Sequence, residues 1–344
     1  MLGRAERPGG HPLTWRAVRL MVAAMRSESS LLSTAAVRPS MDAIDLFAGA
    51  GGFTTGAEQA GCRVLWAANH WPAAVKVHAE NHPDTEHLCQ DLLSADWAEV
   101  PEHEVMLCSP SCTGHTKARG KDRPHHDLAR STAWAVVSAA EYHRPRVVIV
   151  ENVPEFRDWA LYPSWLDAMT RLGYAAAPYV VDAADFGVPQ HRVRLFIVLT
   201  RSAAPIELDL PKLAHKPARN IVEVNAGRWR LISDTHRPLK PNTLARIAAG
   251  RVVFGERFLI AYYGNSKSGR SLDRPLGTVT THDRYAIIDG DRMRMLTVDE
   301  CRAAMGFPGS YRLAVDRKTA VHLLGNAVCP PVAKHLIDAV KAAV

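Results

Sequence analysis

The sequence predicts an α/β fold with a doubly wound, mostly parallel sheet, and two observations support this prediction. Short apolar runs alternate with helical patterns between residues 41 and 200. Chemically active residues directly follow some of these runs, as Cys108 follows Val105-Met106-Leu107 and Glu151 follows Val147–Val150. Apolar strands that alternate with helices are typical of a parallel sheet covered on both faces, and such sheets bind ligands at the carboxyl ends of their strands.

The first two strand–helix pairs begin at Met41. A strand at 41–46 meets a glycine-rich turn that opens a helix at about 52–60. A second strand at 63–68 precedes a helix at about 72–81. In both pairs a short apolar run bounded by turn residues predicts the buried strand.

The second half of the predicted sheet repeats this pattern. Apolar runs at 104–108, 146–150 and 193–200 predict three further strands. Helices are expected between them, at about 130–141 and 162–172.

Beyond residue 200 the alternation stops. Residues 204–290 mix strand-like pieces, turns and basic side chains, and we predict that they form a small, mixed region beside a main domain at 41–203. A helix is expected at 296–305, and Pro330-Pro331 opens a last helix, because proline is tolerated in the first helical turn. The segment 291–344 is therefore expected to return to the main domain.

The bulk properties fit a globular protein. A chain of 344 residues, 47% of them hydrophobic, can hold one large domain and a smaller one. No apolar run reaches the length of a membrane span, and no signal-peptide pattern is present. The six cysteines lack the paired spacing of a zinc site, and a chain of this size does not need disulfides, so we expect a reducing, cytoplasmic setting and no metal. We also expect a monomer without a membrane partner.

The net charge of +7 is unevenly distributed. Residues 201–275 carry fourteen Lys or Arg and six Asp or Glu, whereas the rest of the chain beyond residue 40 is acidic on balance. This predicts a polyanion-binding region beside a catalytic body, although a solvated basic surface is the alternative. Residues 1–40 carry six Arg and two Glu without a core-forming pattern. We expect them to be a disordered extension, with an organelle-targeting peptide as the alternative.

The glycine-rich turn Phe47–Gly52 is the first candidate binding motif. Its glycines would let the backbone approach a nucleotide-type ligand, and Phe47 could stack on an aromatic base. A tight strand–helix turn without a ligand is the simpler interpretation.

Cys112 is the candidate nucleophile, because it lies on a loop just beyond a buried strand. Cationic residues such as Lys117 and Arg119 follow it and would favour a thiolate. A small buried cysteine is the alternative, and Cys108 fits that description better because it ends the apolar run.

Glu151 and the two arginines of Gln190-His191-Arg192-Val193-Arg194 complete the candidate chemistry. A buried strand delivers Glu151, so we expect a desolvated carboxyl with a raised pKa that can donate a proton near neutrality. Arg192 and Arg194 share a face by the period of two and could clamp a phosphate or a base carbonyl. A structural glutamate and ordinary surface arginines are the alternatives.

Taken in chain order, these motifs resemble those of the DNA (cytosine-5) methyltransferases. The matching segments are Asp45–Phe53, Ser109–Cys112, Glu151–Val153, Gln190–Arg194, Arg294–Thr297 with Glu300, Gly306–Pro308 and Gly325–Val328. The resemblance covers about residues 41–344 and implies a Rossmann-like, S-adenosylmethionine-dependent methyltransferase fold.

The resemblance also implies a mechanism. The target cytosine is flipped out of double-stranded DNA, and the thiolate of Cys112 adds to its C6. Glu151 protonates N3, while Arg192 and Arg194 hold the cytosine and the adjoining backbone. The methyl group of S-adenosylmethionine passes to C5, after which the C5 proton and Cys112 leave.

The same resemblance implies the binding residues. The cofactor would be bound by Asp45, Phe47, Gly49, Gly51, Gly52, His70, Trp71, Asp91 and Asn326. DNA would be contacted by Lys117, Arg119, Arg228 and Arg230. A cognate restriction endonuclease is a candidate partner.

The chain departs from the family pattern in two motifs. Ser111 replaces the proline that usually precedes the nucleophile, which predicts a less stiff loop. The family has an acidic residue after the second strand to bind the ribose, and the segment Asn69-His70-Trp71 is expected to place His70 there. A neutral imidazole can accept a hydrogen bond from only one ribose hydroxyl.

Two other functions remain open. A tRNA cytosine-5 methyltransferase shares this fold, but its Cys-Phe-Thr signature is absent between Arg194 and Arg294. A non-catalytic DNA-binding regulator on the same scaffold is the other alternative, and the intact Cys112 and Glu151 argue against it.

Overall fold

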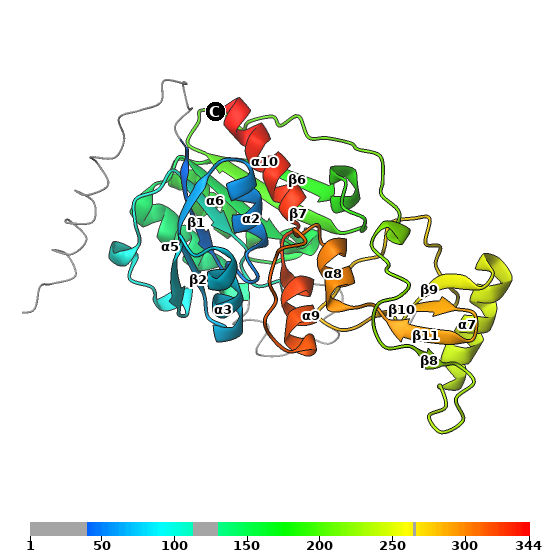
Figure 1. Ribbon diagram of the computed structural model, residues 1–344. Helices are drawn as coiled ribbons and strands as arrows, with labels where there is room; N and C mark the ends of the chain where they lie inside the picture. The colour runs from blue at the N-terminus through cyan, green and yellow to red at the C-terminus, as the bar shows by residue number, and fades with distance from the viewer. Residues whose placement is uncertain (1–39, 113–129, 264–265) are drawn as a thin grey trace, which may run out of the picture. The chain divides into compact units, whose positions relative to one another are not determined.

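Two β-sheets organise the part of the chain that the computed structural model describes, residues 40–112, 130–263 and 266–344. The large sheet has seven strands in the order β3-β2-β1-β4-β5-β7-β6, and the small one has four in the order β8-β11-β10-β9 (Figure 1). Both sheets belong to a single unit that spans Ser40–Val344.

The large sheet confirms the predicted mostly parallel α/β fold. Its strands are β1 (Asp42–Leu46), β2 (Arg63–Asn69), β3 (Glu86–Cys89), β4 (Val105–Cys108), β5 (Val147–Asn152), β6 (Ala175–Asp182) and β7 (Val193–Thr200). Strands β1 to β5 pair in parallel, whereas β7 runs antiparallel to both β5 and β6. The five predicted strands are present, and β3 and β6 are additional.

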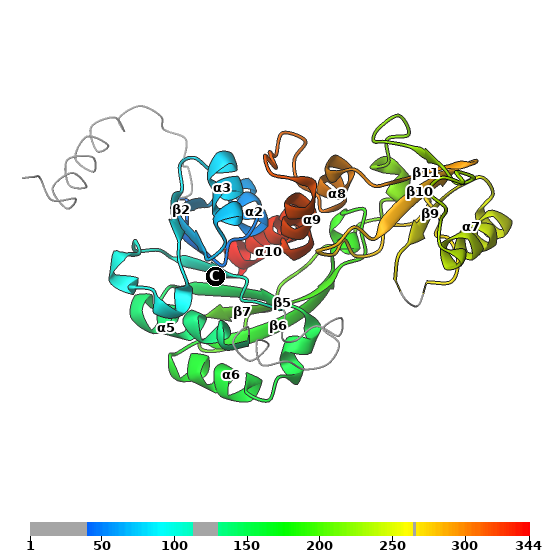
Figure 2. The ribbon, with the colours of Figure 1, turned by 90° about the horizontal axis from the view of Figure 1, so that it is seen from below.

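Helices cover both faces of the large sheet (Figure 2). They are α2 (Gly52–Gln59), α3 (Pro72–Asn81) and α10 (Pro330–Ala343) on one face, and α5 (Ala133–His143) and α6 (Tyr162–Arg171) on the other. Strand β1 serves both layers, because Ala43 packs into the α2–α10 core while Ile44 packs into the α5–α6 core. Among the described helices, none combines the length and apolar character needed to cross a membrane.

The small sheet has a hydrophobic core of its own. Its strands are β8 (Arg230–Leu231), β9 (Arg257–Ala261), β10 (Tyr285–Asp289) and β11 (Arg292–Met295), and helix α7 (Pro241–Phe254) contributes Ile247 to its core. The sheet continues past the predicted boundary at residue 290, because β11 pairs with both β10 and β8. Helices α8 (Val298–Ala304) and α9 (Arg317–Asn326) follow it, and α8 matches the helix predicted at 296–305.

A buried ion pair joins the end of the small sheet to α8. The two terminal nitrogens of Arg294 each lie 2.7 Å from a carboxylate oxygen of Glu300, and both side chains are at most 2% exposed. Backbone N–H groups of Glu223 and Thr297 also donate to this carboxylate, at 2.8 and 2.7 Å. The carboxylate therefore links β11, the start of α8 and the segment before β8.

The C-terminal helix returns to the glycine-rich turn. Helix α10 packs on α2, and the carbonyl oxygen of Val328 lies where a Cβ atom on Gly52 would have to be. Only glycine at position 52 allows this close backbone approach.

We expect Gly52→Ala to lower the free energy of unfolding by about 3 kcal/mol, since the backbone of Val328 would have to move to admit the methyl group. The matched control is Gly309→Ala, because a Cβ there meets no atom within 4 Å. Urea unfolding of the two variants measures the difference, and equal midpoints would contradict the close approach.

Glu300→Gln should cost about 3–5 kcal/mol, because it leaves the buried guanidinium of Arg294 without its counter-charge. Asp299→Asn on the same helix is the control, since its carboxylate pairs with Arg302 while 74% exposed and should contribute about 1 kcal/mol or less.

The same ion pair predicts a pH dependence. Burial raises the pKa of Glu300, but hydrogen bonds from Arg294 and from backbone N–H groups outweigh it and leave the pKa lowered. The stabilisation is therefore fully present above the ordinary carboxyl pKa of about 4.3 and is lost as the pH falls below it. Wild type and Glu300→Gln should converge in stability on acidification, and a constant difference would contradict this account.

Candidate active site

The two cysteines at the end of β4 have different environments. Cys108 ends the strand and is completely buried, whereas Cys112 lies on the following loop and is partly exposed. Cys112 is thus the one of the two that a substrate can reach.

Hydrogen bonds from three elements fix the loop that carries Cys112. They are Ser109 N to Leu46 O at 3.0 Å, Asn152 Nδ2 to Pro110 O at 3.1 Å, and Ser111 N to the hydroxyl of Thr132 at 3.0 Å. The loop is anchored through the backbone N–H of Ser111, a donor that a proline at this position would lack. Sequence reasoning missed Asn152, whose only signal is its place directly after Glu151.

Glu151 lies near the carboxyl end of β5, at the edge of the sheet, and is 7% exposed. Its Oε1 atom is 3.1 Å from Nε of Arg194 on β7. Burial raises the pKa of Glu151, and the charges of Arg194 and Arg192 offset part of that rise. The expectation of a desolvated carboxyl with a raised pKa is confirmed.

The expectation of a Cys112 thiolate stays a prediction, because Lys117 and Arg119, on which it rests, lie outside the described residues. Within those residues, burial raises the pKa of Cys112, and the opposing charges of Arg194 and Arg192 do not cancel that rise.

The two arginines of the Gln190–Arg194 motif have different partners. Arg192 is 3% exposed and donates to three backbone carbonyls, those of Val279 (3.1 Å), Gly325 and Ala327 (2.9 Å each). Burial, followed by the charge of Arg194, lowers the pKa of Arg192 to about 10. The side chain of Arg194 alone of the pair contacts Glu151.

Gln190 and Asp182 support the same motif, and sequence reasoning assigned them no role. Gln190 is fully buried, accepts from Val279 N at 2.5 Å and donates to Ala304 O at 2.9 Å. Asp182, at the end of β6, accepts from Arg192 N at 2.8 Å. Gln190 lies two residues before Arg192, and this spacing of an extended segment was the signal that could have indicated its role.

Most of the predicted cofactor residues follow the ends of three adjacent parallel strands. Asp45, Phe47, Gly49, Gly51 and Gly52 lie at or after the end of β1, His70 and Trp71 follow β2, and Asp91 follows β3. Asn326 is exposed at the end of α9, and His322 of that helix packs its ring against Trp71 at 5.1 Å. The parallel pairing brings the three strand ends to one edge of the sheet.

The glycine-rich turn has a strained backbone and a free acceptor beside it. Phe47 has a φ of 62°, which is rare for a residue with a side chain and recurs at functional sites. Asp45 is fully buried and accepts from the N–H and hydroxyl of Thr54 through Oδ2, whereas its Oδ1 has no partner within the described residues. That free oxygen fits a ligand that brings its own hydrogen-bond donor.

The predicted ribose position directly follows β2. Asn69 is the last residue of that strand, and its side-chain oxygen accepts from Trp71 N at 2.9 Å. His70 is exposed one residue further on. Asp91 is exposed and caps the short helix η1 (Leu92–Ser94) by accepting from Leu93 N at 3.1 Å.

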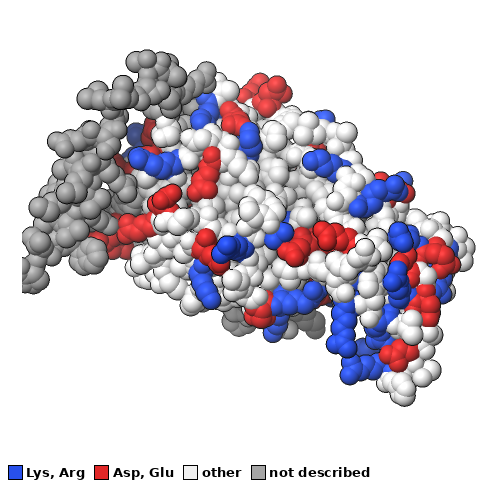
Figure 3. Space-filling view, in the orientation of Figure 1, with Lys and Arg blue, Asp and Glu red and all other residues white. Residues whose placement is uncertain are grey.

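The predicted DNA contacts in the small sheet are only partly free. Lys and Arg side chains gather over this sheet and α7 (Figure 3). Arg228 is exposed, but Arg230 donates to the carbonyls of Leu231 and Arg237. The guanidinium groups of Arg292 and Arg294 lie 4.8 and 5.1 Å from the centre of the Trp229 ring.

Comparisons with known proteins match the whole described unit. The family model of the C-5 cytosine-specific DNA methylases matches residues 41–342. The chain is 25% identical to the type II methyltransferase M.NlaX of Neisseria lactamica over 87% of its own length and 96% of that protein. It is 24% identical to M.HhaI of Haemophilus parahaemolyticus, over 83% and 89% of the two chains.

A solved structure supports the fold independently. A mutant of the DNMT2 protein of Spodoptera frugiperda superposes with a TM-score of 0.64 at 18% identity, over 88% of this chain and all of that one. With the match of the family model and the arrangement of Cys112 and Glu151 at one sheet edge, these findings show that the chain belongs to the C-5 cytosine-specific DNA methylases and is a DNA cytosine-5 methyltransferase.

Proposed function

We propose that this enzyme methylates C5 of a flipped cytosine in double-stranded DNA through a covalent bond between Cys112 and C6. The meeting of Cys112, Glu151 and Arg194 at one edge of the large sheet carries this proposal. Strands β4 and β5 are parallel neighbours, so their carboxyl ends lie together. Strand β7 is antiparallel to β5, which brings its amino end and Arg194 beside Glu151.

The three side chains have complementary tasks in this reaction. The sulfur of Cys112 adds to C6, while Glu151, whose pKa is raised by burial, donates a proton to N3. Arg194 pairs with Glu151 and holds it in place, and its positive charge also acts on the thiol of Cys112. Because the pKa of Cys112 is raised, the thiol must pass its proton to solvent water as the substrate binds. Transfer of the C5 proton to water and expulsion of the sulfur complete the cycle.

The cofactor in this proposal is S-adenosylmethionine, which supplies an electrophilic methyl group. The glycine-rich turn, the free Oδ1 of Asp45 and the ends of β2 and β3 would hold it. The roles of Trp71, Asp91 and Asn326 in cofactor binding are part of the same proposal. His70, which is exposed directly after β2, would accept a hydrogen bond from a ribose hydroxyl.

The relatives named above are type II methyltransferases, and we extend that role to this chain. It would then modify a short DNA site as a monomer in the cytoplasm, opposite a cognate restriction endonuclease. Arg228 and the basic side chains of the small sheet would contact the DNA backbone. Methylation of tRNA is the alternative function, because tRNA cytosine-5 methyltransferases share this fold.

Cys112→Ser should abolish methyl transfer, and Glu151→Gln should slow it by about 10²–10⁴-fold, because the amide cannot donate the proton that the addition needs. Transfer of labelled methyl groups to duplex DNA and to tRNA measures both effects and identifies the substrate. Cys62→Ser is the control, since that cysteine directly precedes β2 and so lies at the opposite end of this strand from the proposed site.

Duplex DNA that contains 5-fluorocytosine gives a second readout of the same variants. Wild type and Cys62→Ser should form a covalent adduct and Cys112→Ser should not. An adduct with Cys112→Ser, or methylation of tRNA alone, would contradict the proposed function.

DNA affinity should depend steeply on salt, with a slope of the log–log plot that falls by about 0.9 for each phosphate contact removed. We expect Arg228→Ala to reduce this slope. Arg171→Ala is the control, because that arginine is 79% exposed on α6 and lies outside the basic region. If both variants keep the wild-type slope, Arg228 does not contact phosphate.

A further inference from the structure

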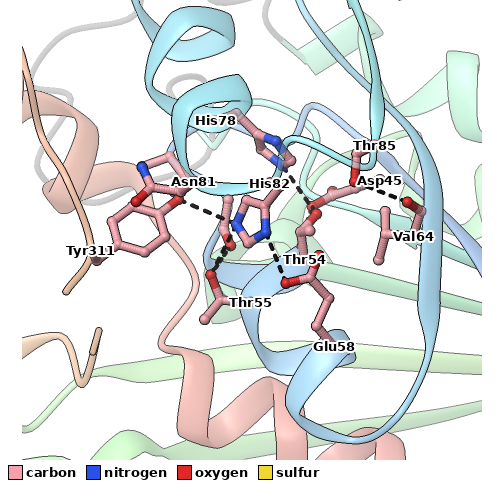
Figure 4. A network of polar contacts seen from close by, with 12 residues as sticks. Asp45, Thr54, Thr55, Glu58, Val64, His78, Asn81, His82, Thr85 and Tyr311 are labelled. Carbon is pink, nitrogen blue, oxygen red and sulfur yellow. Dashed lines mark hydrogen bonds and ion pairs between the residues drawn. The ribbon is translucent and has the colours of Figure 1, made fainter. Parts of the chain in front are cut away.

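Behind the glycine-rich turn, a chain of hydrogen bonds leads from Asp45 to His87 (Figure 4 shows its buried part). The hydroxyl of Thr54 lies 2.8 Å from Oδ2 of Asp45, and Nε2 of His78 lies 3.0 Å from the same hydroxyl. Nδ1 of His78 lies 2.7 Å from Nε2 of His87. The four residues come from β1, α2, α3 and β3, so the fold and not a local turn assembles the chain.

The chain connects the core to the surface. Asp45 and Thr54 are fully buried and His78 is 1% exposed, whereas His87 is partly exposed on the edge strand β3. A proton can therefore enter at His87 without any opening of the sheet.

The ionised state of Asp45 fixes the direction of every bond. A carboxylate can only accept, so Thr54 donates to Asp45 and its oxygen must accept from an Nε2–H of His78. Nδ1 of His78 then has a free lone pair and accepts from an Nε2–H of His87. Both histidines are neutral in this arrangement.

Protonation of Asp45 reverses every bond and leaves none unmade. The carboxyl then donates to Thr54, whose hydroxyl donates to Nε2 of His78. Nδ1–H of His78 donates to Nε2 of His87. Both rings remain neutral but have exchanged the nitrogen that carries the proton.

We propose that Thr54, His78 and His87 are positioning residues that conduct a proton between solvent and Asp45, the buried carboxyl beside the cofactor turn. A hydronium ion of the solvent protonates Nδ1 of His87 and leaves as water, and the Nε2 proton of His87 passes to Nδ1 of His78. The Nε2 proton of His78 passes to Thr54, and the original hydroxyl proton of Thr54 passes to Asp45. One proton is gained by Asp45, and no bond between heavy atoms changes.

The electrostatics assign the titration to the carboxyl and not to the rings. Burial raises the pKa of Asp45 to about 7, against the lowering effect of its hydrogen bonds from Thr54. Burial, with the neighbouring His82 and His87, lowers the pKa of His78 well below its usual value. Burial and His82 also lower the pKa of His87.

Other titratable groups surround the chain without interrupting it. His82 packs its ring 4.7 Å from that of His78 and pairs with Glu58 at 2.9 Å. Burial raises the pKa values of Cys108, beside Asp45, and of Tyr311, beside His82, so both stay neutral. Within the described residues, no group of three such side chains is arranged to hold a metal ion.

The consequence for the cofactor rests on the proposed function. S-adenosylmethionine is cationic at its sulfonium and its amino group, so an ionised Asp45 with a free Oδ1 attracts it more strongly than a neutral carboxyl. Cofactor affinity should therefore weaken as the pH falls through the pKa of Asp45.

NMR of the cofactor-free protein tests the chain directly. Between about pH 6 and pH 8, the ring nitrogens of His78 and His87 should exchange from Nε2–H to Nδ1–H on acidification, with the same midpoint as the carboxyl carbon of Asp45. His103 is the internal control, since its Nδ1 is held by the carbonyl of Pro101 at 2.8 Å and should keep its proton there. Conversion of both rings to imidazolium, or titration of Asp45 with unchanged rings, would overturn the proposal.

Thr54→Val removes only the hydroxyl and should uncouple the rings from Asp45. His87→Phe at the partly exposed end is a second variant that tests the chain if Thr54→Val fails to fold. In His87→Phe, the proton of the His78 ring should no longer move between the two ring nitrogens at the pH at which Asp45 titrates. Retention of the coupled exchange in either variant would contradict the assigned path.

Calorimetry separates this inference from the proposed function. Wild-type affinity for S-adenosylmethionine should weaken by up to about tenfold per pH unit below the midpoint, and Asp45→Asn should bind weakly without this dependence. If the rings exchange but S-adenosylmethionine does not bind at any pH, the proton path stands and the cofactor assignment fails. If no exchange occurs while the cofactor binds, the proton path fails and the cofactor assignment stands.

Discussion

One buried guanidinium connects the catalytic strand to the rest of the enzyme. Arg192, directly before β7, donates to the carbonyl of Val279 and to those of Gly325 and Ala327. A buried carbonyl left without a donor costs about 1–3 kcal/mol, so this one side chain stabilises two returning segments at once. The second of these segments places Val328 against Gly52, and the position of the glycine-rich turn therefore depends on an interaction that begins beside the active site.

The local sequence pattern could not reveal that Arg192 and Arg194 have different partners. The period of two predicted that Arg192 and Arg194 share a face and could clamp a phosphate or a base carbonyl, whereas Arg192 donates to backbone carbonyls. Both charges lower the pKa values of Cys112 and Glu151. The partners that separate their roles lie far along the chain, at Val279 and at Gly325. A strand pattern predicts the face of a residue, whereas the choice between a backbone partner and a substrate is made by tertiary structure.

The degree of burial explains both which strands were predicted from the sequence and which were missed. Strands buried on both faces need continuous apolar runs, so β1, β2, β4, β5 and β7 were visible in the sequence. Strands β3 and β6 lie at the two edges of the sheet, where burial constrains the sequence less. Three of the four residues of β3 are exposed, and β6 tolerates Pro178 because an edge strand can lack a donor. The antiparallel direction of β7 depends on its neighbours and is not encoded in its own apolar run.

Burial acts on the nucleophile and on the acid in the same direction, because it raises the pKa values of both Cys112 and Glu151. In the proposed mechanism this would keep the proton that Glu151 donates, but also the proton that Cys112 has to lose. Arg194 and Arg192 lower both pKa values, so their charges would favour the thiolate at the expense of the acid. The bound base would supply the remaining bias, because it would accept the proton of Glu151 in the same step in which sulfur adds to C6.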